Sequence, residues 1–215
     1  VAERIIFPNA PITEALLDIR VTLPGDTTLE QLATFHEAVK EIYPTKRERI
    51  AWEGGFEIKE GYPRVFEPRG GPDGYMFSSS DGKQIVQARL DGFTFNRLKP
   101  YDRWETFRDQ TLHLWQIYVQ IAGPLRITRA ALRYINRIEI PLPMRDFKDY
   151  IRTLPEIAPG LPQGLERYVM QLYIPVLEGP AMAIVTQRQD PVPEASTVVP
   201  LIFDIDVIHP HPLDV

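Results

Sequence analysis

Apolar and polar residues alternate along several short stretches of this chain. The clearest stretch spans residues 127–140, where one face carries Ala130, Leu132, Tyr134, Ile138 and Ile140. A period of two is typical of a strand with one buried face. Similar patterns predict strands over residues 15–23, 50–59, 75–79, 83–90, 93–98, 168–175, 181–188 and 198–208. The dipeptides Asp81-Gly82 and Asp91-Gly92 predict hairpin turns, because glycine suits the positive φ that such turns require. The second could instead be a bulge in one longer strand.

A three- and four-residue spacing of apolar positions predicts two principal helices. The first, residues 27–44, opens on the capping box Thr27-x-x-Glu30 and ends at Pro44. The second, residues 102–122, carries an aromatic stripe made of Trp104, Phe107, Trp115 and Tyr118. A weaker pattern predicts a third helix over residues 144–154, and the charged residues 46–49 are interpreted as a solvated segment.

This order of elements predicts an α+β protein with a curved, mainly antiparallel sheet and the two principal helices on one of its faces. The segment from Arg20 to Pro24 resembles the segment from Arg137 to Pro141. Each ends a strand that precedes a helix and about three further strands, which favours a duplicated unit. We therefore expect one domain of two similar halves, residues 1–100 and 125–215, joined by the helix at 102–122. TATA-binding-protein-like and helix-grip folds share this pattern, and the analogy carries no function.

Composition excludes several kinds of chemistry. The chain has 215 residues and no cysteine, so disulfides, thiolate metal sites and a cysteine nucleophile are excluded. It shows no signal peptide and no apolar run of about 18 residues, so we expect a cytoplasmic protein without a membrane segment. A formal net charge of -5 argues against nucleic acid as a partner, since such proteins usually carry a basic surface.

Three arginines, Arg129, Arg133 and Arg137, share one face of the strand predicted at 127–140. Arginines on a half-buried face must be solvated, paired with carboxylates or used to bind an anion. The simpler interpretation is a cross-strand ladder of ion pairs. Carboxylates at matching strand positions are Asp18, Glu53, Glu57, Asp204 and Asp206. The alternative is a groove for an anionic ligand or an acidic protein partner, which arginine suits through bidentate hydrogen bonding.

The pair Asp204 and Asp206 resembles a two-carboxylate metal clamp, because residues two apart on a strand point the same way. Spacing fixes no third ligand, so no cofactor is predicted and a divalent metal is kept as a minor alternative. His36 falls within the apolar stripe of the first helix and is interpreted as a core or boundary residue. Ser78–Ser80 lack the pattern of a nucleophile elbow. The sequence therefore offers no conventional catalytic constellation.

Four motifs carry a resemblance over nearly the whole chain. They are Asn9-Ala-Pro-Ile-Thr-Glu-Ala15, Tyr101-x-x-Trp104-x-x-Phe107, Arg133-Tyr-Ile-Asn-Arg-Ile138 and Asp204-Ile-Asp206. Together they resemble a sporadically distributed prokaryotic family of uncharacterised proteins, in which the first motif usually begins Asn-Pro-Pro-Ile. The resemblance implies no activity. Family chains continue beyond the Asp-x-Asp strand into helical segments, so the resemblance implies a truncated C-terminus here.

The leading expectation is a non-catalytic binding or interaction module that self-associates and uses the arginine face. One alternative is a metal-assisted hydrolase or phosphoryl-processing enzyme that uses Asp204 and Asp206, with Arg133 and Arg137 holding an anionic substrate. A saddle that binds nucleic acid is the other alternative, which the acidic composition disfavours.

Overall fold

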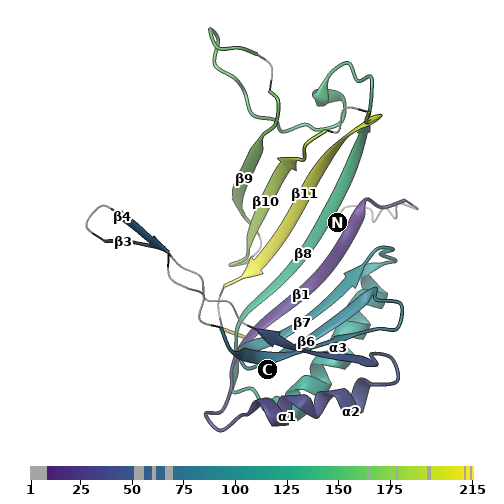
Figure 1. Cartoon of the computed structure of the whole chain (residues 1–215), viewed down its shortest axis with the longest axis vertical. Helices are drawn as coiled ribbons and strands as arrows, with labels where there is room; N and C mark the ends of the chain where they lie inside the picture. Colours follow the sequence, from purple (N-terminus) through teal and green to yellow (C-terminus); the bar gives the residue numbers. More distant parts are fainter. Residues whose placement is uncertain are drawn as a thin grey trace. The chain divides into compact units, whose positions relative to one another are not determined.

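The computed structural model describes residues 9–50, 56–59, 62–65, 70–163, 165–177, 179–192, 195–210, 212–213 and 215. Nine strands form one antiparallel sheet in the order β2-β5-β6-β7-β1-β8-β11-β10-β9 (Figure 1). Their bounds are β1 Ile12–Thr22, β2 Thr45–Ile50, β5 Pro72–Ser78, β6 Gln84–Arg89, β7 Gly92–Leu98, β8 Arg126–Pro141, β9 Val169–Pro175, β10 Met182–Gln189 and β11 Val198–His209. A separate hairpin pairs β3 Phe56–Lys59 with β4 Tyr62–Val65. The predicted α+β class and antiparallel sheet are confirmed.

The helices are α1 Leu29–Ala33, α2 Phe35–Val39 and α3 Trp104–Ala122, with a single 3-10 turn, η1, at Phe147–Asp149. The first predicted helix is thus two short helices that meet at Thr34, whose hydroxyl donates to the carbonyl of Gln31 at 2.7 Å. Its cap is Thr28, not Thr27, because the Thr28 hydroxyl accepts from the Gln31 amide. Gly123 ends α3 in the left-handed conformation, with φ of 57°.

One prediction about local structure is wrong, and one strand was not predicted. Residues 144–154 form only η1, whose N-cap is Asp146: its carboxylate accepts from the Lys148 amide, and no longer helix follows. Residues 46–49 are largely exposed, as predicted for a solvated segment, but they also form the middle of β2, which pairs with β5 and was not predicted. A run of four charged residues hid this strand, because its side chains give no apolar alternation. Of the strand predicted at 50–59, residues 51–55 lie outside the described residues.

The chain divides into two compact units. One comprises residues 1–16, 98–101 and 131–210, and the other comprises residues 17–97, 102–130 and 211–215. We call them the β9–β11 unit and the α3 unit. The bounds of these units differ from those of the two predicted halves, and the predicted duplication stays a prediction.

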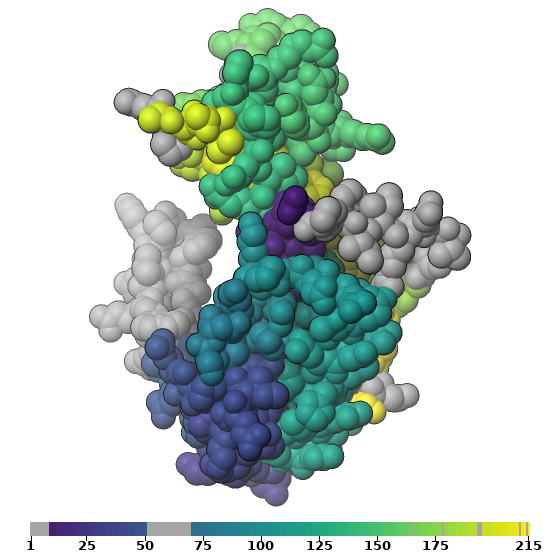
Figure 2. All heavy atoms as spheres, turned by 90° about the vertical axis from the view of Figure 1, so that its right-hand side faces the viewer, coloured from purple at the N-terminus to yellow at the C-terminus, as the bar shows by residue number. Residues whose placement is uncertain are grey.

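In the α3 unit, the three helices lie on one side of strands β5, β6 and β7 (Figure 1). Atoms of α1 and α2, blue in Figure 2, pack beside the teal atoms of α3. Phe93 of β7 is fully buried, and its ring centroid lies 5.7 Å from those of Trp115 and Tyr118 on α3. Phe95 stacks on Phe107 at 5.4 Å. The helix-facing side of these strands is therefore an aromatic core.

The β9–β11 unit has a smaller core on one face of its strands. Ile140, Ile151, Val199 and Leu201 are buried together. The segment after β8 covers this cluster, with Met144, Phe147, Leu154 and Tyr168 packed against it. None of the helices in the described part of the chain combines the length and the apolarity needed to cross a bilayer.

Candidate functional site

A cluster of charged residues lies on the face of the α3-unit strands that points away from the helices. Its centre is Asp18 of β1, which is buried. One carboxylate oxygen, Oδ1, accepts from Arg89 Nη2 at 2.8 Å and from the Thr94 hydroxyl at 2.7 Å. The other, Oδ2, accepts from Arg129 Nη1 at 2.9 Å and from Arg20 Nε at 3.1 Å. Three guanidinium groups therefore share one carboxylate, and we call these residues the Asp18 cluster.

Arg89 is the most deeply buried member, with 2 % of its surface exposed. Its Nε donates to Asp91 Oδ1 at 2.9 Å, and its Nη1 donates to the Thr94 hydroxyl at 2.6 Å. All three guanidinium nitrogens thus donate a hydrogen bond, which a buried charge requires. Arg20 and Arg129 are more accessible, with 37 % and 33 % of their side chains exposed.

Strand geometry explains why these residues meet. Asp18 and Arg20 are two apart on β1 and share a face, and β6 and β7 present Arg89 and Thr94 on the same side. Gly92 opens β7 next to the cluster. A Cβ atom there would lie 2.2 Å from the Ile19 carbonyl oxygen and 2.9 Å from Arg89 Nη2. Glycine therefore permits β1 and the Arg89 guanidinium to approach this closely.

The surroundings of Asp18 favour its charged form. Burial acts to raise the pKa of this carboxyl, but the nearby Arg89 charge and the hydrogen bonds from Arg89 and Thr94 outweigh burial. The pKa of Asp18 therefore lies below its ordinary value of 3.8. On the helix side, burial raises the pKa of the Tyr118 hydroxyl, which donates to the Arg89 carbonyl at 2.8 Å.

The lowered pKa of Asp18 predicts a specific acid sensitivity. A carboxyl whose folded-state pKa is depressed stabilises the fold above its unfolded pKa of about 4, and that stabilisation is lost as the pH falls further. We expect the free energy of unfolding to fall between pH 5 and pH 2. In Asp18→Asn the slope of this fall should be smaller, as measured by urea unfolding at each pH. An equal slope in both proteins would contradict a depressed pKa.

The other two arginines of β8 belong to the β9–β11 unit, whereas Arg129 belongs to the α3 unit. Arg133 donates from Nε to Asp204 Oδ1 at 2.9 Å and from Nη2 to Asp204 Oδ2. These hydrogen bonds raise the pKa of Arg133. Arg137 makes longer contacts of 3.4 Å with Glu139 and Asp190. Each predicted arginine thus contacts a carboxylate, and the predicted partners Asp18 and Asp204 are among them.

The two aspartates of the proposed metal clamp lie on β11, opposite Thr186 and Ile184 of β10. Asp204 already accepts hydrogen bonds on both oxygens from Arg133, so a metal bound there would have to displace this arginine. Within the described ranges no group of three or more metal-ligating side chains is found. The metal hypothesis stays a prediction. Of the other carboxylates, Glu53 lies outside the described residues, as does the side chain of Glu57.

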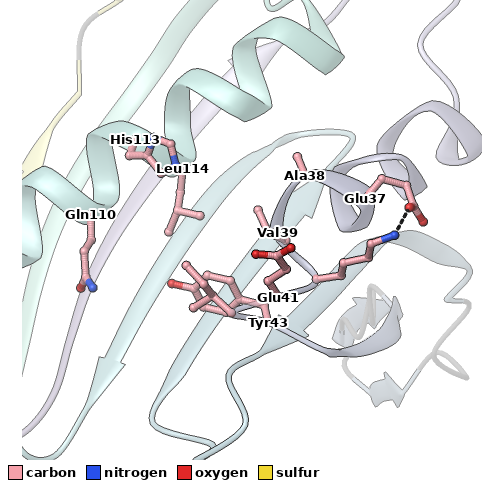
Figure 3. Close-up of a pocket in the computed structure, with 10 residues that line it drawn as sticks. Glu37, Ala38, Val39, Glu41, Tyr43, Gln110, His113 and Leu114 are labelled. Atoms are coloured by element: carbon pink, nitrogen blue, oxygen red, sulfur yellow. Dashed lines mark hydrogen bonds and ion pairs between the residues drawn. The ribbon is translucent and has the colours of Figure 1, made fainter.

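A separate concavity lies between the end of α2 and the middle of α3. It has a volume of about 370 Å³ and is lined by residues 37–43 together with Gln110, His113 and Leu114. Figure 3 shows Leu114 and Gln110 of α3 on one side and Val39 and Tyr43 on the other. At its rim Lys40 donates to Glu37 at 2.7 Å. His36 is not part of this lining and instead stacks on Phe77 with 5.6 Å between ring centroids.

Sequence reasoning missed Arg20, Arg89 and Asp91 as site residues. The available signal was the pair of short motifs Asp18-x-Arg20 and Arg89-x-Asp91, the second of which lies at a predicted Asp-Gly turn. Neither motif reveals the strand order β6-β7-β1. This order brings Asp18 of β1 within hydrogen-bonding distance of Arg89 at the end of β6.

A scan against protein-family models and a search of curated proteins found no match to this chain.

Proposed function

We propose that the protein is a non-catalytic binding module that holds an anion, of phosphate or carboxylate type, at the Asp18 cluster. The observation that carries the proposal is the convergence of Arg20, Arg89 and Arg129 on the single carboxylate of Asp18. With Asp91 included, the cluster contains three guanidinium groups and two carboxylates.

The accessible arginines define where the anion would bind. Arg20 donates hydrogen bonds from Nε to Asp18 and from Nη1 to Asp91, and 37 % of its side chain is exposed to solvent. A guanidinium carries five N–H donors in a fork, so it can serve a second anion while it stays bonded to Asp18. Arg89 is buried and bonds to the same carboxylate, so its positive charge adds to the attraction that an anion would experience at Arg20 and Arg129.

The protonation properties of the cluster favour binding over catalysis. Guanidinium groups stay protonated at all ordinary pH values. The pKa of Asp18 is lowered, so this carboxylate also stays charged near neutral pH. A general acid or base works best with a pKa near the working pH, and none of these groups meets that condition.

Titration with inorganic phosphate, followed by amide NMR shifts, tests the proposal. We expect saturable shifts at Asp18, Arg20, Arg89 and the Asp91-Gly92 turn. The Arg129→Gln protein should bind phosphate about tenfold or more weakly, because a hydrogen bond to a charged group contributes about 1.5–3 kcal/mol.

Arg133→Gln is the matched control, since Arg133 lies on the same strand face but is held by Asp204 in the other unit. Its phosphate affinity should equal that of the unsubstituted protein. If phosphate and acetate both fail to shift these amides, or if Arg133→Gln weakens binding as much as Arg129→Gln, the assignment to the Asp18 cluster is wrong.

A further inference from the structure

We propose that strand β9 pairs antiparallel with β9 of a second copy of this chain and so joins two molecules through their sheet edges. Among the described strands, β9 is the last in the sheet order, and only β10 pairs with it (Figure 1). The inference is independent of the anion site, because β9 lies in the β9–β11 unit.

The composition of the two outermost strands differs sharply. At one end of the sheet order, β2 has the sequence TKRERI, with four charged residues in six. Charged side chains on an edge strand discourage pairing with another chain. At the other end, β9 has the sequence VMQLYIP, with no charged residue and its single proline at the last position. Val169 and Tyr173 of β9 are 70 % and 64 % exposed. Among the described strands, the β2 edge is therefore protected by charge, whereas the β9 edge has no such protection against pairing.

The hydrogen bonds to β10 identify which backbone groups of β9 face outward. The Gln189 amide donates to the Tyr168 carbonyl at 3.1 Å, and the Val176 amide donates to the Ala181 carbonyl at 2.9 Å. In an antiparallel ladder bonded residues alternate, so the even-numbered residues of β9 face β10. The odd-numbered residues Val169, Gln171 and Tyr173 then direct their amide and carbonyl groups to the free edge.

These outward groups fix the register of the pair. A two-fold axis at Gln171 places Gln171 opposite its own equivalent and Val169 opposite Tyr173 of the second copy. The resulting three bonded pairs would supply roughly six backbone hydrogen bonds, and none of them needs the missing N–H of Pro175.

The side chains in this register are self-complementary. An exposed tyrosine meets an exposed valine on each side of the axis, and aromatic–β-branched pairs of this kind stabilise antiparallel strands. Because β9 carries no charge, no like charges oppose each other across the axis. A second copy is therefore the occupant that this edge fits, through an isologous contact in which each strand supplies both halves.

A charge-swap experiment tests both the dimer and its register. The unsubstituted protein should show twice the chain mass by light scattering after size exclusion, with dissociation on dilution. Gln171→Lys and Gln171→Glu should each be monomeric, since identical charges would face each other across the axis. An equimolar mixture of the two variants should recover the dimer as a heterodimer.

Ile42→Lys provides the control, because it also replaces an apolar or neutral exposed residue by lysine but lies in the α3 unit. It should remain dimeric. Circular dichroism should show the same folded content in all three variants, since Gln171 and Ile42 are exposed. An unsubstituted protein that is monomeric at every concentration, or a Gln171→Lys protein that stays dimeric, would overturn the inference. So would a mixture of the charge variants that fails to associate.

Discussion

Replacement of Asp18 by asparagine is expected to lower the free energy of unfolding by about 3–5 kcal/mol, because it leaves the buried Arg89 guanidinium with only the half-exposed Asp91 as counter-charge. Arg89 cannot turn toward solvent to escape this loss. Its guanidinium is fixed by Thr94 and Asp91, and its backbone carbonyl is held by Tyr118 from the helix side. Arg20 and Arg129, which are more exposed, would adjust at little cost.

Urea unfolding near pH 7 measures this effect, with Asp91→Asn as the matched control. Asp91 also bonds to Arg89 and Arg20, but about half of its side chain is exposed. Its replacement should therefore cost less than about 1 kcal/mol, as for other surface ion pairs. The buried-charge account fails if the two asparagine variants lose similar amounts of stability. Asp18→Asn combined with Arg89→Met should recover part of the loss, since the buried charge that lost Asp18 is then removed.

The second large effect is expected on the opposite face of the same strands. Phe93→Ala should cost about 3–5 kcal/mol, the usual range for deletion of a fully buried aromatic ring. Phe93 is fully buried and touches Trp115 and Tyr118, so its removal opens a cavity between β7 and α3. Trp115 and Tyr118 also stack on each other with 5.4 Å between ring centroids, so a shift of either ring into the space would disturb this contact.

Leu112→Ala on the same helix is the comparison, because Leu112 is exposed and is not part of this aromatic core. It should change the free energy of unfolding by no more than about 0.5 kcal/mol. A loss for Phe93→Ala as small as that for Leu112→Ala would show that α3 does not depend on this contact.

Local periodicity predicted much of the fold because most strands have one apolar face. The strand at 127–140 was expected from its alternation and is observed as β8, and the aromatic stripe around Trp115 identified α3. The same reasoning failed at β2, where the charges of an edge strand conceal the period of two. It also failed at η1, where the apolar spacing over residues 144–154 predicted a helix and only one 3-10 turn forms.

The Asp18 cluster was only partly predictable, for a reason of topology. Asp18 and Arg129 were recognised as candidates from strand position alone. Arg89 was not, because its role depends on β1 lying between β7 and β8, and nothing local encodes that strand order. Partner choice among carboxylates is likewise a property of register. The Arg133–Asp204 pair forms because β8 lies beside β11. Alternation along the strands reduced the candidate partners to five carboxylates but did not identify which of them pairs with Arg133.

The bond from the Tyr118 hydroxyl to the Arg89 carbonyl has a consequence for how the α3 unit opens. Arg89 is held on one side by a helix residue and on the other by the buried carboxylate of Asp18. Separation of α3 from the strands would strip this carbonyl of its buried donor, and loss of the ion cluster would leave the same residue with an unpaired charge. Loss of either contact would therefore weaken the other. The amide hydrogens of the helical layer and of the charged face should consequently exchange with solvent as one cooperative unit.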